Sequence, residues 1–573
     1  MGLILLLVSL LFGYGAIELH ASHYFDSHLQ SIPFPRSLIS DDQPYRTAYH
    51  FQPVKNWIND PNGPMIYNGI YHLFYQYNPD GVVWAPPVWA HSTSTDLINW
   101  TPQPIAIQPE MDANINGSWS GSATILPGNI PAMLFTGLNP KYEQVQVLAY
   151  PKDINDPYLK EWFLAPNNPV MFPTPENQIN ASSFRDPTTA WRLRDGIWRV
   201  LVGSKTGTTG TSLLFKSKDF VNWVQIKEPL YSYKLSGMWE CPDFFPVYIN
   251  CKPIGVDTST IGHHVKHVLK NSLDDTKHDI YTIGTYLHEK EAYVPDVGFM
   301  NESSLRYDYG KYYASKTFFD DVTTRRILLG WANESSSVAD DMEKGWSGIH
   351  TIPRNVWLDC SGKQLIQWPV SEIEALREKP ISVPHQVLKG GSIIELHGVT
   401  AAQADVEISF GIHDLKNIEK FKASWTDPQL LCSQKGTSVS GGLGPFGLLT
   451  LASKGLEEYT AVFFRVFKAH NNKFVVLMCS DQSSSSLNQT PDKTSYGTFV
   501  GVNPIREGLS LRILIDHSVV ESFGGKGKNV ITARVYPTMA IYDDAHLYVF
   551  NNGTGSVRIT SLTAWSMKKA RIA

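Results

Sequence analysis

The chain has 573 residues, of which 42% are hydrophobic and 12% aromatic, and its formal net charge at pH 7 is -5. A chain of this length is too long for one ordinary hydrophobic core, so two or more domains are expected. The slightly acidic charge provides no basic surface, which excludes nucleic acid as an expected partner.

The N-terminus carries an apolar run from Met1 to Ala16 that ends in small residues. The run is too short to span a bilayer, which predicts a secretory signal peptide over residues 1–22. No later stretch is long and apolar enough for a membrane span, so we expect a secreted protein without a membrane partner. Residues 23–44 hold no periodic pattern and are interpreted as an N-terminal lead.

An internal repeat follows the lead. Residues 65–74 read as a hairpin around an Asn-Gly turn, and residues 190–200 repeat it around an Asp-Gly turn. Each hairpin is followed by the same closing phrase, Ser-Thr-Asp-Leu-Ile-Asn-Trp at 94–100 and Ser-Lys-Asp-Phe-Val-Asn-Trp at 217–223. Short alternating apolar segments between Gly, Pro, Asn and Asp predict an all-β fold.

Three acidic residues sit at intervals that match the repeat. Asp60 and Asp186 enter the same strand of their repeats, 126 positions apart (186 − 60), which is two units of roughly sixty residues, near the ~50 of a propeller blade. Glu240 follows Asp186 by 54 positions (240 − 186), or about one blade. Because the innermost strands of a propeller face one channel, these acids are predicted to converge there.

The composition changes after Pro380, where the aspartate-proline phrases stop and plain alternation begins. We therefore predict a β-propeller over residues 45–367, a linker with a short helical segment over 368–381 and a β-sandwich over 382–573.

Cysteines and glycosylation sequons agree with secretion. Five cysteines do not make a disulfide framework, and the odd count leaves at least one free. Cys432 and Cys479 are the best candidate pair for an oxidising compartment. Sequons occur at Asn116, Asn180, Asn301, Asn333, Asn488 and Asn552. A further sequon at Asn99 lies inside the repeat and is expected to stay unmodified.

Asp60 lies in the phrase Trp-Ile-Asn-Asp-Pro-Asn-Gly at 57–63. A proline after it favours an extended backbone, and the asparagines can bind backbone or sugar hydroxyls, which suits a carboxylate that attacks a sugar carbon. The alternative is an ordinary surface turn, because these residue types dominate turns.

The phrases at 57–63, Phe-Arg-Asp-Pro at 184–187 and Trp-Glu-Cys-Pro-Asp at 239–243 resemble the three signature motifs of glycoside hydrolase family 32, the plant acid invertases and fructan exohydrolases. The segments 119–124 and 274–279 also match. The resemblance implies a five-bladed β-propeller followed by a C-terminal β-sandwich, acting on β-fructofuranosides with retention of configuration and without a cofactor.

By matching motif, Asp60 is the nucleophile, Glu240 the general acid/base, and Asp186 with Arg185 holds the fructosyl hydroxyls. Further residues match positions that bind the sugar in this family: Trp57, Asn59, Gln76, Trp84, Trp119, Ser120, Asp274 and Lys277. Members that prefer sucrose resemble this chain in carrying an acid at position 274 and a lysine three residues later.

The physical chemistry agrees with these roles. Retention requires two carboxyl groups about 5 to 5.5 Å apart, one ionised to attack and one protonated to release the leaving group. Repulsion from Asp60 and Asp186 should keep Glu240 protonated, so we expect an acid-side optimum.

Other patterns are interpreted as structural. Asp516 and Glu521 could form a catalytic pair but lie in the predicted sandwich. His263, His264 and His267 lack a further ligand motif, so we expect a solvated loop and no metal. The glycine-rich segments at 207–210 and 524–528 lack the context of a phosphate cradle and read as turns. Cys241 is expected to be a packed free thiol.

One segment departs from the family, since Trp84-Ala85-Pro86-Pro87 stands where relatives usually read Trp-Gly-Asn-Ile. Two prolines remove two backbone donors at the expected pocket, which leaves the roles of Trp84 and Trp89 open.

The first hypothesis is a secreted acid invertase. Pro242 in the third motif resembles the residue that the cell-wall branch of the family carries there. The alternatives are a fructan exohydrolase that acts on levan or inulin and a catalytically inactive fructoside-binding homologue. Cell-wall polysaccharide and a proteinaceous inhibitor are candidate partners, although the pI of about 6.4 gives little attraction to polyanions.

Overall fold

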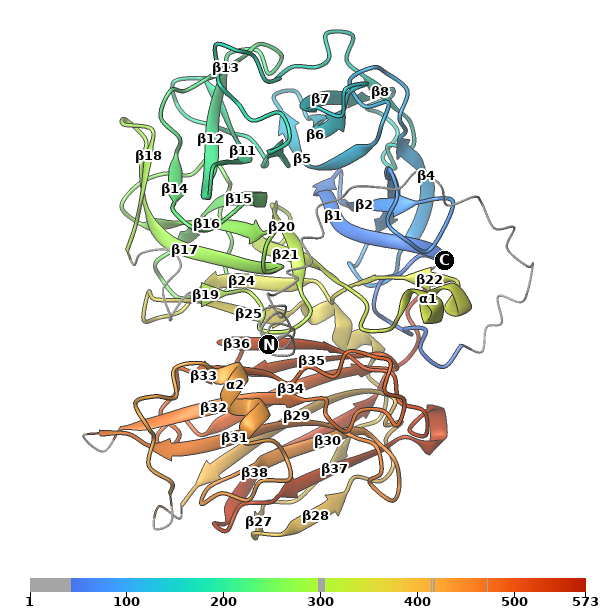
Figure 1. The fold of residues 1–573 in the computed structure, drawn as a ribbon, viewed down its shortest axis with the longest axis vertical. Coiled ribbons are helices and arrows are strands. Elements are labelled where there is room, and N and C mark those ends of the chain that lie inside the picture. Colours follow the sequence, from blue (N-terminus) through green and yellow to red (C-terminus); the bar gives the residue numbers. More distant parts are fainter. Residues whose placement is uncertain (1–42, 297–304, 414, 416–417, 471–472, 573) are drawn as a thin grey trace, which may run out of the picture. The chain divides into compact units, whose positions relative to one another are not determined.

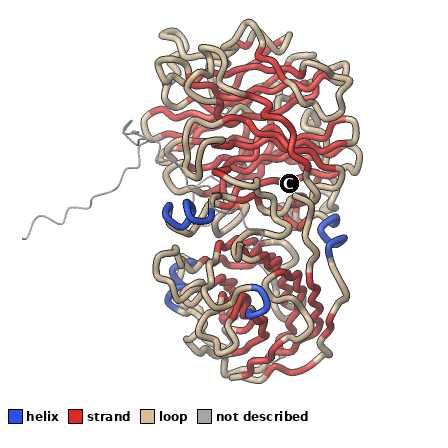
Figure 2. The backbone as a smooth tube through the Cα atoms, turned by 90° about the vertical axis from the view of Figure 1, so that its right-hand side faces the viewer, coloured by secondary structure: helices blue, strands red, loops and turns tan. Residues whose placement is uncertain are grey.

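In a computed structural model the regular secondary structure of the protein is nearly all β-strand, as the sequence predicts (Figure 2). The structure describes residues 43–296, 305–413, 415, 418–470 and 473–572. The predicted signal peptide, nearly all of the N-terminal lead and the sequon at Asn301 lie outside these ranges. None of the helices in the described ranges has the length and apolar character needed to cross a membrane.

Five sheets form the first part of the fold, one for each blade of a propeller. The first sheet contains β1 (Asn56–Tyr67), β2 (Ile70–Asn78), β3 (Val88–Ser94) and β4 (Thr101–Ile107), with β22 (Trp346–Ser347) beside β1. The second contains β5 (Ser118–Leu126), β6 (Ile130–Leu138), β7 (Gln144–Pro151) and β8 (Trp162–Leu164). The third contains β9 (Phe184–Arg185), β10 (Trp191–Arg192), β11 (Trp198–Thr206), β12 (Thr209–Ser217), β13 (Trp223–Gln225) and β14 (Tyr231–Tyr233).

The last two blades have the same antiparallel order. The fourth contains β15 (Trp239–Tyr248), β16 (Val265–Leu273), β17 (His278–Leu287), β18 (Ala292–Pro295) and β19 (Leu305–Arg306). The fifth contains β20 (Tyr313–Asp320), β21 (Arg325–Ala332), β23 (Ile349–His350), β24 (Arg354–Leu358) and β25 (Leu365–Pro369).

The blades surround a common centre, where β1 contacts β5 and β20, and β15 contacts β11 and β20 (Figure 1). The ring is closed by β22, which follows the fifth blade's first strands but pairs in parallel with β1 of the first blade. Acids carried by different blades therefore meet at one place.

The two closing phrases fold alike, which explains why they repeat. Asp96 and Asp219 each accept hydrogen bonds from the backbone N–H groups two and three residues later. Trp100 and Trp223 each donate the indole N–H to the backbone carbonyl three residues earlier, at 3.1 and 3.0 Å. Each phrase is thus a self-contained turn within a blade, joining β3 to β4 and β12 to β13.

In four central strands the regular pairing register is interrupted next to the residue that faces the centre. Register shifts occur between Ile58 and Pro61, Ser118 and Gly121, Glu240 and Asp243, and Tyr313 and Lys316. In the third blade Asp186 directly follows β9 and has a φ of 66°. Because a bulge re-aims side chains, these irregularities turn one polar residue per blade toward the centre.

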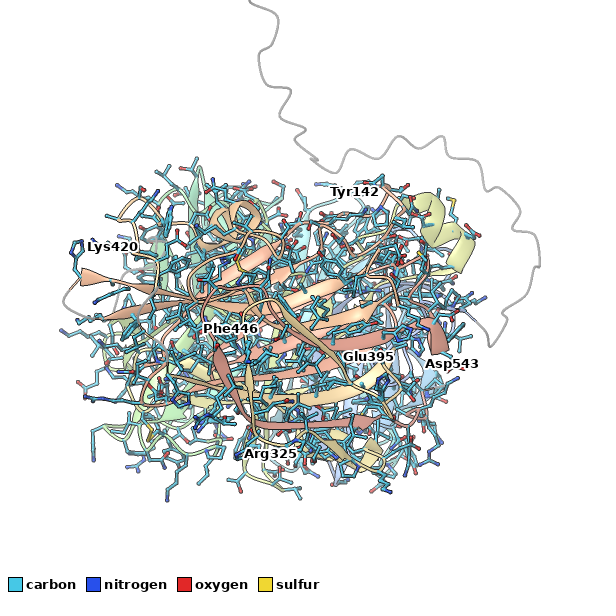
Figure 3. All side chains as sticks on the ribbon, turned by 90° about the horizontal axis from the view of Figure 1, so that it is seen from below. Tyr142, Arg325, Glu395, Lys420, Phe446 and Asp543 are labelled. Carbon is cyan, nitrogen blue, oxygen red and sulfur yellow. A yellow bond between two sulfur atoms is a disulfide. The ribbon has the colours of Figure 1, made fainter. Side chains whose placement is uncertain are left out.

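Two sheets form the C-terminal β-sandwich. One contains β26 (Ile381–Ser382), β27 (Gln386–Leu388), β29 (Gln403–Ile412), β34 (Leu509–Asp516), β35 (Val519–Gly524), β36 (Asn529–Arg534) and β38 (Val557–Ser566). The other contains β28 (Ser392–Glu395), β30 (Phe446–Ala452), β31 (Thr460–Lys468), β32 (Phe474–Asp481), β33 (Tyr496–Val500) and β37 (His546–Asn551). Phe446, labelled in Figure 3, belongs to the core between them.

The helices within the described residues are few and short. They are α1 (Val338–Lys344), α2 (Pro428–Gln434), and the 3-10 helices η1 (Ser371–Leu376) and η3 (Tyr542–Asp544). η1 lies in the predicted linker, between the last propeller strand and the first sandwich strand.

The sheet that contains β34 is buried on both faces. Ile513 and Ile515 pack in the sandwich core, whereas Leu514 between them packs with Ile352 of the propeller. Side chains of a strand alternate between faces, so the apolar run in β34 reflects a strand covered on both sides.

Buried charges accompany this apolar contact. Asp516 accepts three hydrogen bonds from the backbone N–H groups of residues 48–50, at 2.6 to 2.9 Å. Glu521 accepts from the Ile352 N–H at 2.7 Å and from Arg354 at 2.6 Å, and both acids are fully buried. These two acids therefore join the propeller to the sandwich, in line with the structural interpretation.

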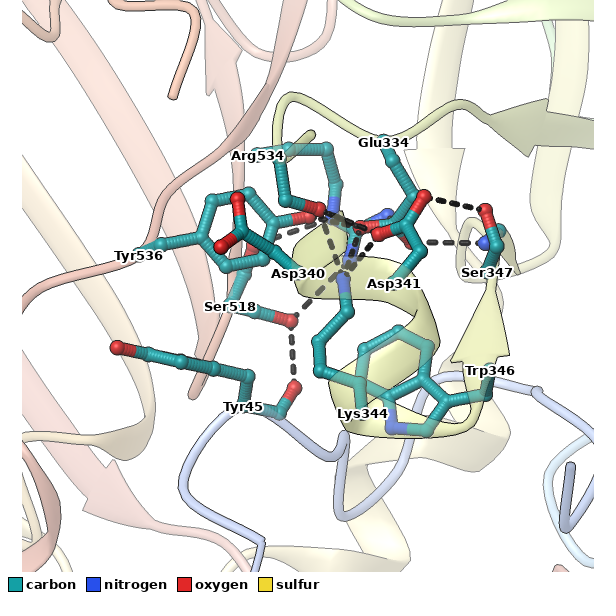
Figure 4. A network of polar contacts seen from close by, with 12 residues as sticks. Tyr45, Glu334, Asp340, Asp341, Lys344, Trp346, Ser347, Ser518, Arg534 and Tyr536 are labelled. Carbon is teal, nitrogen blue, oxygen red and sulfur yellow. Dashed lines mark hydrogen bonds and ion pairs between the residues drawn. The ribbon is translucent and has the colours of Figure 1, made fainter. Parts of the chain in front are cut away.

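A second network of polar contacts, around Glu334, stabilises β22, the strand that closes the ring (Figure 4). The carboxylate of Glu334 accepts hydrogen bonds from Arg534 of β36 at 2.8 Å and from Lys344 of α1 at 2.9 Å. The hydroxyl of Tyr536 and the Gly348 N–H also donate to it. Since β22 lies between Lys344 and Gly348, the sandwich supports β22 and, through it, β1.

Candidate active site

The three acids expected from the sequence meet around Cys241. Its thiol lies 3.4 Å from Asp60 Oδ2 and 3.6 Å from Asp186 Oδ2, and its backbone N–H donates to Asp186 Oδ2 at 2.9 Å. Glu240 is the residue directly before it in β15. Residues 126 and 54 positions apart in the sequence thus form one cluster at the propeller centre, and Cys241 is a buried free thiol.

Asp60 is held by donors on both oxygens. Ser120 of β5 donates to Oδ2 at 2.6 Å and the side chain of Asn59 to Oδ1 at 3.0 Å, while the Trp57 indole N–H fixes Asn59 at 2.9 Å. Burial raises the pKa of Asp60 above 3.8, although the hydrogen bond from Ser120 opposes the rise. The carboxylate is oriented as a nucleophile must be.

The backbone before Asp60 is fixed as well. Buried His350 donates its Nε2–H to the carbonyl of Asn59 at 2.7 Å. Burial lowers the pKa of His350 to about 4, so the ring is neutral near pH 5 and keeps this tautomer. Sequence analysis missed His350, because no motif marks it.

Asp186 is the most deeply buried of the acids, with 3% of its surface exposed. Its backbone N–H donates to Thr136 Oγ1 of β6 at 2.7 Å. Burial raises the pKa of Asp186 to about 7 against the opposing charge of Arg185, and the charges of Glu240 and Asp60 add to the rise. This carboxyl therefore binds a proton more readily than an ordinary aspartate does.

Glu240 is surrounded by donors. Arg185 donates from Nε and from an Nη to Oε1 at 3.1 and 3.0 Å, and Tyr313 of β20 donates its hydroxyl to Oε2. Lys277 Nζ lies 3.7 Å from Oε2. Arg185 was expected beside the sugar hydroxyls with Asp186, which stays a prediction; its guanidinium donates to Glu240 and Asp274. Tyr313 was not expected at all.

Asp274 and Lys277 belong to the same cluster. Lys277 donates to Asp274 Oδ1, and Arg185 donates to Asp274 Oδ2 at 3.3 Å. About a third of the Asp274 side chain is exposed, at 34%. The pair is therefore more than an isolated surface ion pair, because it is tied to Glu240 through both cations.

Two aromatic rings and an amide complete the expected site. Trp84, in the loop after β2, meets Trp119 of β5 edge-on at 6.1 Å, and Arg185 lies over the Trp119 ring at 5.9 Å. The buried Nε2 of Gln76 and Nε1 of Trp119 have no hydrogen-bond partner within the described residues. Such donors suit a polyhydroxyl ligand.

The unusual Pro86-Pro87 segment supports β5 from the side. The carbonyl of Pro87 accepts the Ser118 N–H at 3.0 Å, and the indole of Trp89, fully buried, donates to the Trp119 carbonyl at 2.9 Å. Trp89 thus holds the backbone of Trp119 and does not line the pocket, whereas Trp84 remains partly exposed.

The histidine cluster needs a correction. His263 and His264 lie exposed before β16, but His267 is buried within β16 and stacks on Phe244 at 5.2 Å. The expected loop was wrong for His267, because strand β16 begins earlier than its polar residues suggested. Across the described part of the chain, no group of three His, Cys, Asp or Glu residues is arranged to hold a metal ion.

Two disulfides are present. Cys432 and Cys479 are joined as expected, and Cys251 is joined to Cys360, 109 positions away, which the sequence did not suggest. Of the six sequons expected to carry glycans, five are described. Asn180, Asn333 and Asn488 are exposed, whereas the side-chain amides of Asn116 and Asn552 donate to backbone carbonyls.

Comparison with known proteins assigns both parts of the chain. Residues 50–369 match the Glycosyl hydrolases family 32 N-terminal domain, and residues 372–566 match the Glycosyl hydrolases family 32 C-terminal domain. The fructan 6-exohydrolase of Beta vulgaris is 64% identical over 93% of this chain and 89% of that protein. The insoluble β-fructofuranosidase isoenzyme CWINV1 of Arabidopsis thaliana is 60% identical over 99% of this chain and 98% of that protein. A variant of fructan 1-exohydrolase IIa from Cichorium intybus, solved in complex with 1-kestose, superposes with a TM-score of 0.90 at 50% identity, over 93% of this chain and 99% of that one.

Proposed function

Because this chain belongs to glycoside hydrolase family 32, we propose that it is a retaining β-fructofuranosidase that hydrolyses sucrose to glucose and fructose. One observation carries the proposal, namely the convergence of Asp60, Asp186 and Glu240 from three blades around Cys241. Each acid has its own set of donors, so the three can take different roles.

In this mechanism the Asp60 carboxylate attacks the anomeric carbon of the fructosyl unit. Glu240 gives its proton to the glycosidic oxygen, and glucose leaves. A water molecule then attacks the anomeric carbon and breaks its bond to Asp60, while Glu240 takes a proton from that water. The two displacements each invert the anomeric carbon, which gives net retention. The arginine, lysine and tyrosine donors around Glu240 support its cycling between acid and base, because they stabilise the carboxylate left after proton transfer.

Asp274 favours sucrose over fructan as the substrate. Its carboxylate is oriented by Lys277 and Arg185 beside Glu240, where the leaving group must sit. A carboxylate there can accept hydrogen bonds from glucosyl hydroxyls. The second candidate is a fructan exohydrolase, favoured by the Pro86-Pro87 departure and by the name of the 64% identical relative.

The relatives' names also support a place in the plant cell wall, so we propose an extracellular location there. The exposed sequons and the two disulfides agree with a secreted protein.

Turnover of site variants tests the mechanism. Asp60→Ala and Glu240→Ala should each lower kcat by several orders of magnitude. Azide should trap the fructosyl unit in Glu240→Ala, because the nucleophile is intact, and should fail in Asp60→Ala. Near-normal turnover of Asp60→Ala would refute the assignment.

Sugar release from sucrose, levan and inulin tests the substrate. Asp274→Ala should cost sucrose hydrolysis about 1.5 to 3 kcal/mol, the value of a charge-assisted hydrogen bond, and should spare the fructans by comparison. Asp275→Ala, at the neighbouring position, serves as the matched control. Faster release from levan or inulin than from sucrose by the wild type would select the exohydrolase instead.

A further inference from the structure

Two lysines are buried beneath the acids, although the proposed mechanism uses neither. Lys270 of β16 and Lys316 of β20 are 0% and 2% exposed. An ammonium group in such a place is costly unless carbonyls or carboxylates surround it. Each must therefore have a partner that justifies its burial.

Lys270 has such partners in full. Its Nζ donates to the carbonyls of Cys241 and Ser315 at 2.8 and 2.6 Å and to Ser272 Oγ at 3.0 Å. The carboxylate of Asp279 lies 3.5 Å away and compensates its charge.

Lys316 has different partners. Its Nζ donates to the carbonyls of Pro187 and Pro242 at 3.4 and 3.2 Å, and no carboxylate in the described residues forms an ion pair with it. Pro187 directly follows Asp186, and Pro242 lies two residues after Glu240. One ammonium group from the fifth blade therefore holds the third and fourth blades at the acids.

The backbone at these points is held by side chains more than by regular strand pairing, since Asp186 accepts the Cys241 N–H and Lys270 binds the Cys241 carbonyl. Proline has no N–H, so neither Pro187 nor Pro242 can donate to a neighbouring strand. The register of β15 shifts between Glu240 and Asp243, and that of β20 shifts just before Lys316. Regular strand pairing therefore does not fix the relative positions of the two acids.

The charges around Lys316 come from several elements. The pKa of Lys316 depends on its burial, which lowers it, and on four neighbouring titratable groups: Cys241 and Asp243 of β15, Lys270 of β16 and Asp186 after β9. Asp186 in turn faces Arg185, Glu240, Asp60 and Lys316. Burial raises the pKa of Asp186, and the positive charge of Lys316 is one of the two that oppose this rise.

We propose that Lys316 is a positioning residue: it binds the Pro187 and Pro242 carbonyls and so fixes Asp186 and Glu240 relative to each other, while its charge compensates the buried acids. The proposal rests on the proposed function, because it concerns the acids assigned there. It adds a residue that touches no substrate.

The test compares substitutions that separate hydrogen bonding from charge. Lys316→Met removes both, Lys316→Gln keeps a donor without the charge, and Lys316→Arg keeps both. For Lys316→Met we expect kcat on sucrose to fall about 10- to 100-fold with KM changed less than about threefold, because misplaced groups affect the transition state most. The acid limb of the pH profile of kcat/KM for Lys316→Met should move up by about one pH unit, since the acids lose a nearby cation. Lys316→Gln should share the shifted limb with a smaller loss of kcat, and Lys316→Arg should restore the wild-type limb.

Lys270→Met is the matched control, since it removes an equally buried lysine whose charge is paired with Asp279. It should lower stability without moving the acid limb. The proposal is overturned if Lys316→Met and Lys316→Gln keep the wild-type kcat and pH profile, or if Lys270→Met shifts the limb equally. If Lys316→Met does not fold, Lys316→Gln alone decides, because an unshifted limb in that variant contradicts the charge role. A normal Lys316→Met beside an inactive Asp60→Ala would refute only this inference, whereas an active Asp60→Ala would refute the proposed function.

Discussion

Replacing His50 by glutamine should weaken the contact between propeller and sandwich by an amount that depends on pH. His50 is fully buried, with Nδ1 2.8 Å from Asp516 Oδ2 and Nε2 2.8 Å from Glu521 Oε1. Because both ring nitrogens face carboxylates, both must donate, which requires the imidazolium. Burial lowers the pKa of His50, but the hydrogen bonds that it donates to the two carboxylates outweigh burial, and the net pKa is raised above 6.5.

These shifts define a window of stability. The contribution of His50 is fully present below pH 6.5, its ordinary pKa, and is lost as the pH rises through the raised folded value. For Asp516 and Glu521 burial raises the pKa, but His50 and Arg354 outweigh burial and the net pKa falls below 3.8 and 4.5. Their contribution is present above pH 4.5 and is lost as the pH falls through the folded values. The contact should be strongest between about pH 4.5 and 6.5.

Removing one partner of a buried ion pair costs about 3 to 5 kcal/mol. Urea denaturation followed by tryptophan fluorescence should show this deficit for His50→Gln at pH 5.5. The deficit should be smaller at pH 9, because the charge of His50 is lost as the pH rises through its raised pKa. His91→Gln is the control: burial lowers the pKa of His91 well below its ordinary value, so that ring is neutral at both pH values. A deficit for His50→Gln that does not change with pH would refute the reasoning.

Three further outcomes are expected. Replacing Cys432 and Cys479 by alanine should lower the free energy of unfolding by about 4 kcal/mol, because the disulfide closes a loop with a sequence separation of 47. Denaturation of the oxidised wild type and of the substituted protein measures this difference. His350→Phe should lower kcat about 10- to 100-fold with a smaller change in KM, because the Asn59 carbonyl loses its donor; steady-state kinetics on sucrose would contradict this if kcat were unchanged. Gly203→Ala should cost about 1 to 3 kcal/mol or more, since its Cβ would lie 2.1 Å from a backbone oxygen of the next blade, and a wild-type melting temperature would argue against the close approach.

Much of the fold could be predicted because the repeat depends on contacts between residues that are close in the sequence. The turn at Asp96 and the one at Asp219 each bond to their own next residues, so their sequence is constrained locally. Likewise, the side chains of β34 point alternately to the sandwich core and to the propeller because of the pleat of one strand. Such patterns depend on neighbours within a few positions, which a single sequence displays.

The partners of the acids could not be predicted in the same way. His50 meets Asp516 across 466 positions, and Cys251 meets Cys360 across 109. The bond from Arg185 to Glu240 on the next blade was likewise not expected from the sequence. These contacts depend on how blades and domains meet, and no short spacing encodes that arrangement.

Backbone strain at the centre connects the predictable acids to their less predictable partners. Asp186, Cys241 and Ala314 have φ angles of 66°, 43° and 54°, although none of them is glycine. Such conformations cost about 1 to 3 kcal/mol each and persist only where surrounding contacts enforce them. At the first two positions the strained residue is an acid or donates to one. Ala314 carries no functional side chain, so its strain is best explained by its neighbour: the left-handed turn and the bulge in β20 direct the Tyr313 hydroxyl to Glu240 and place Lys316 beneath Pro187 and Pro242. The fifth blade, which contributes no acid, thus adopts the same distorted strand entry as the others in order to hold the acids of its neighbours.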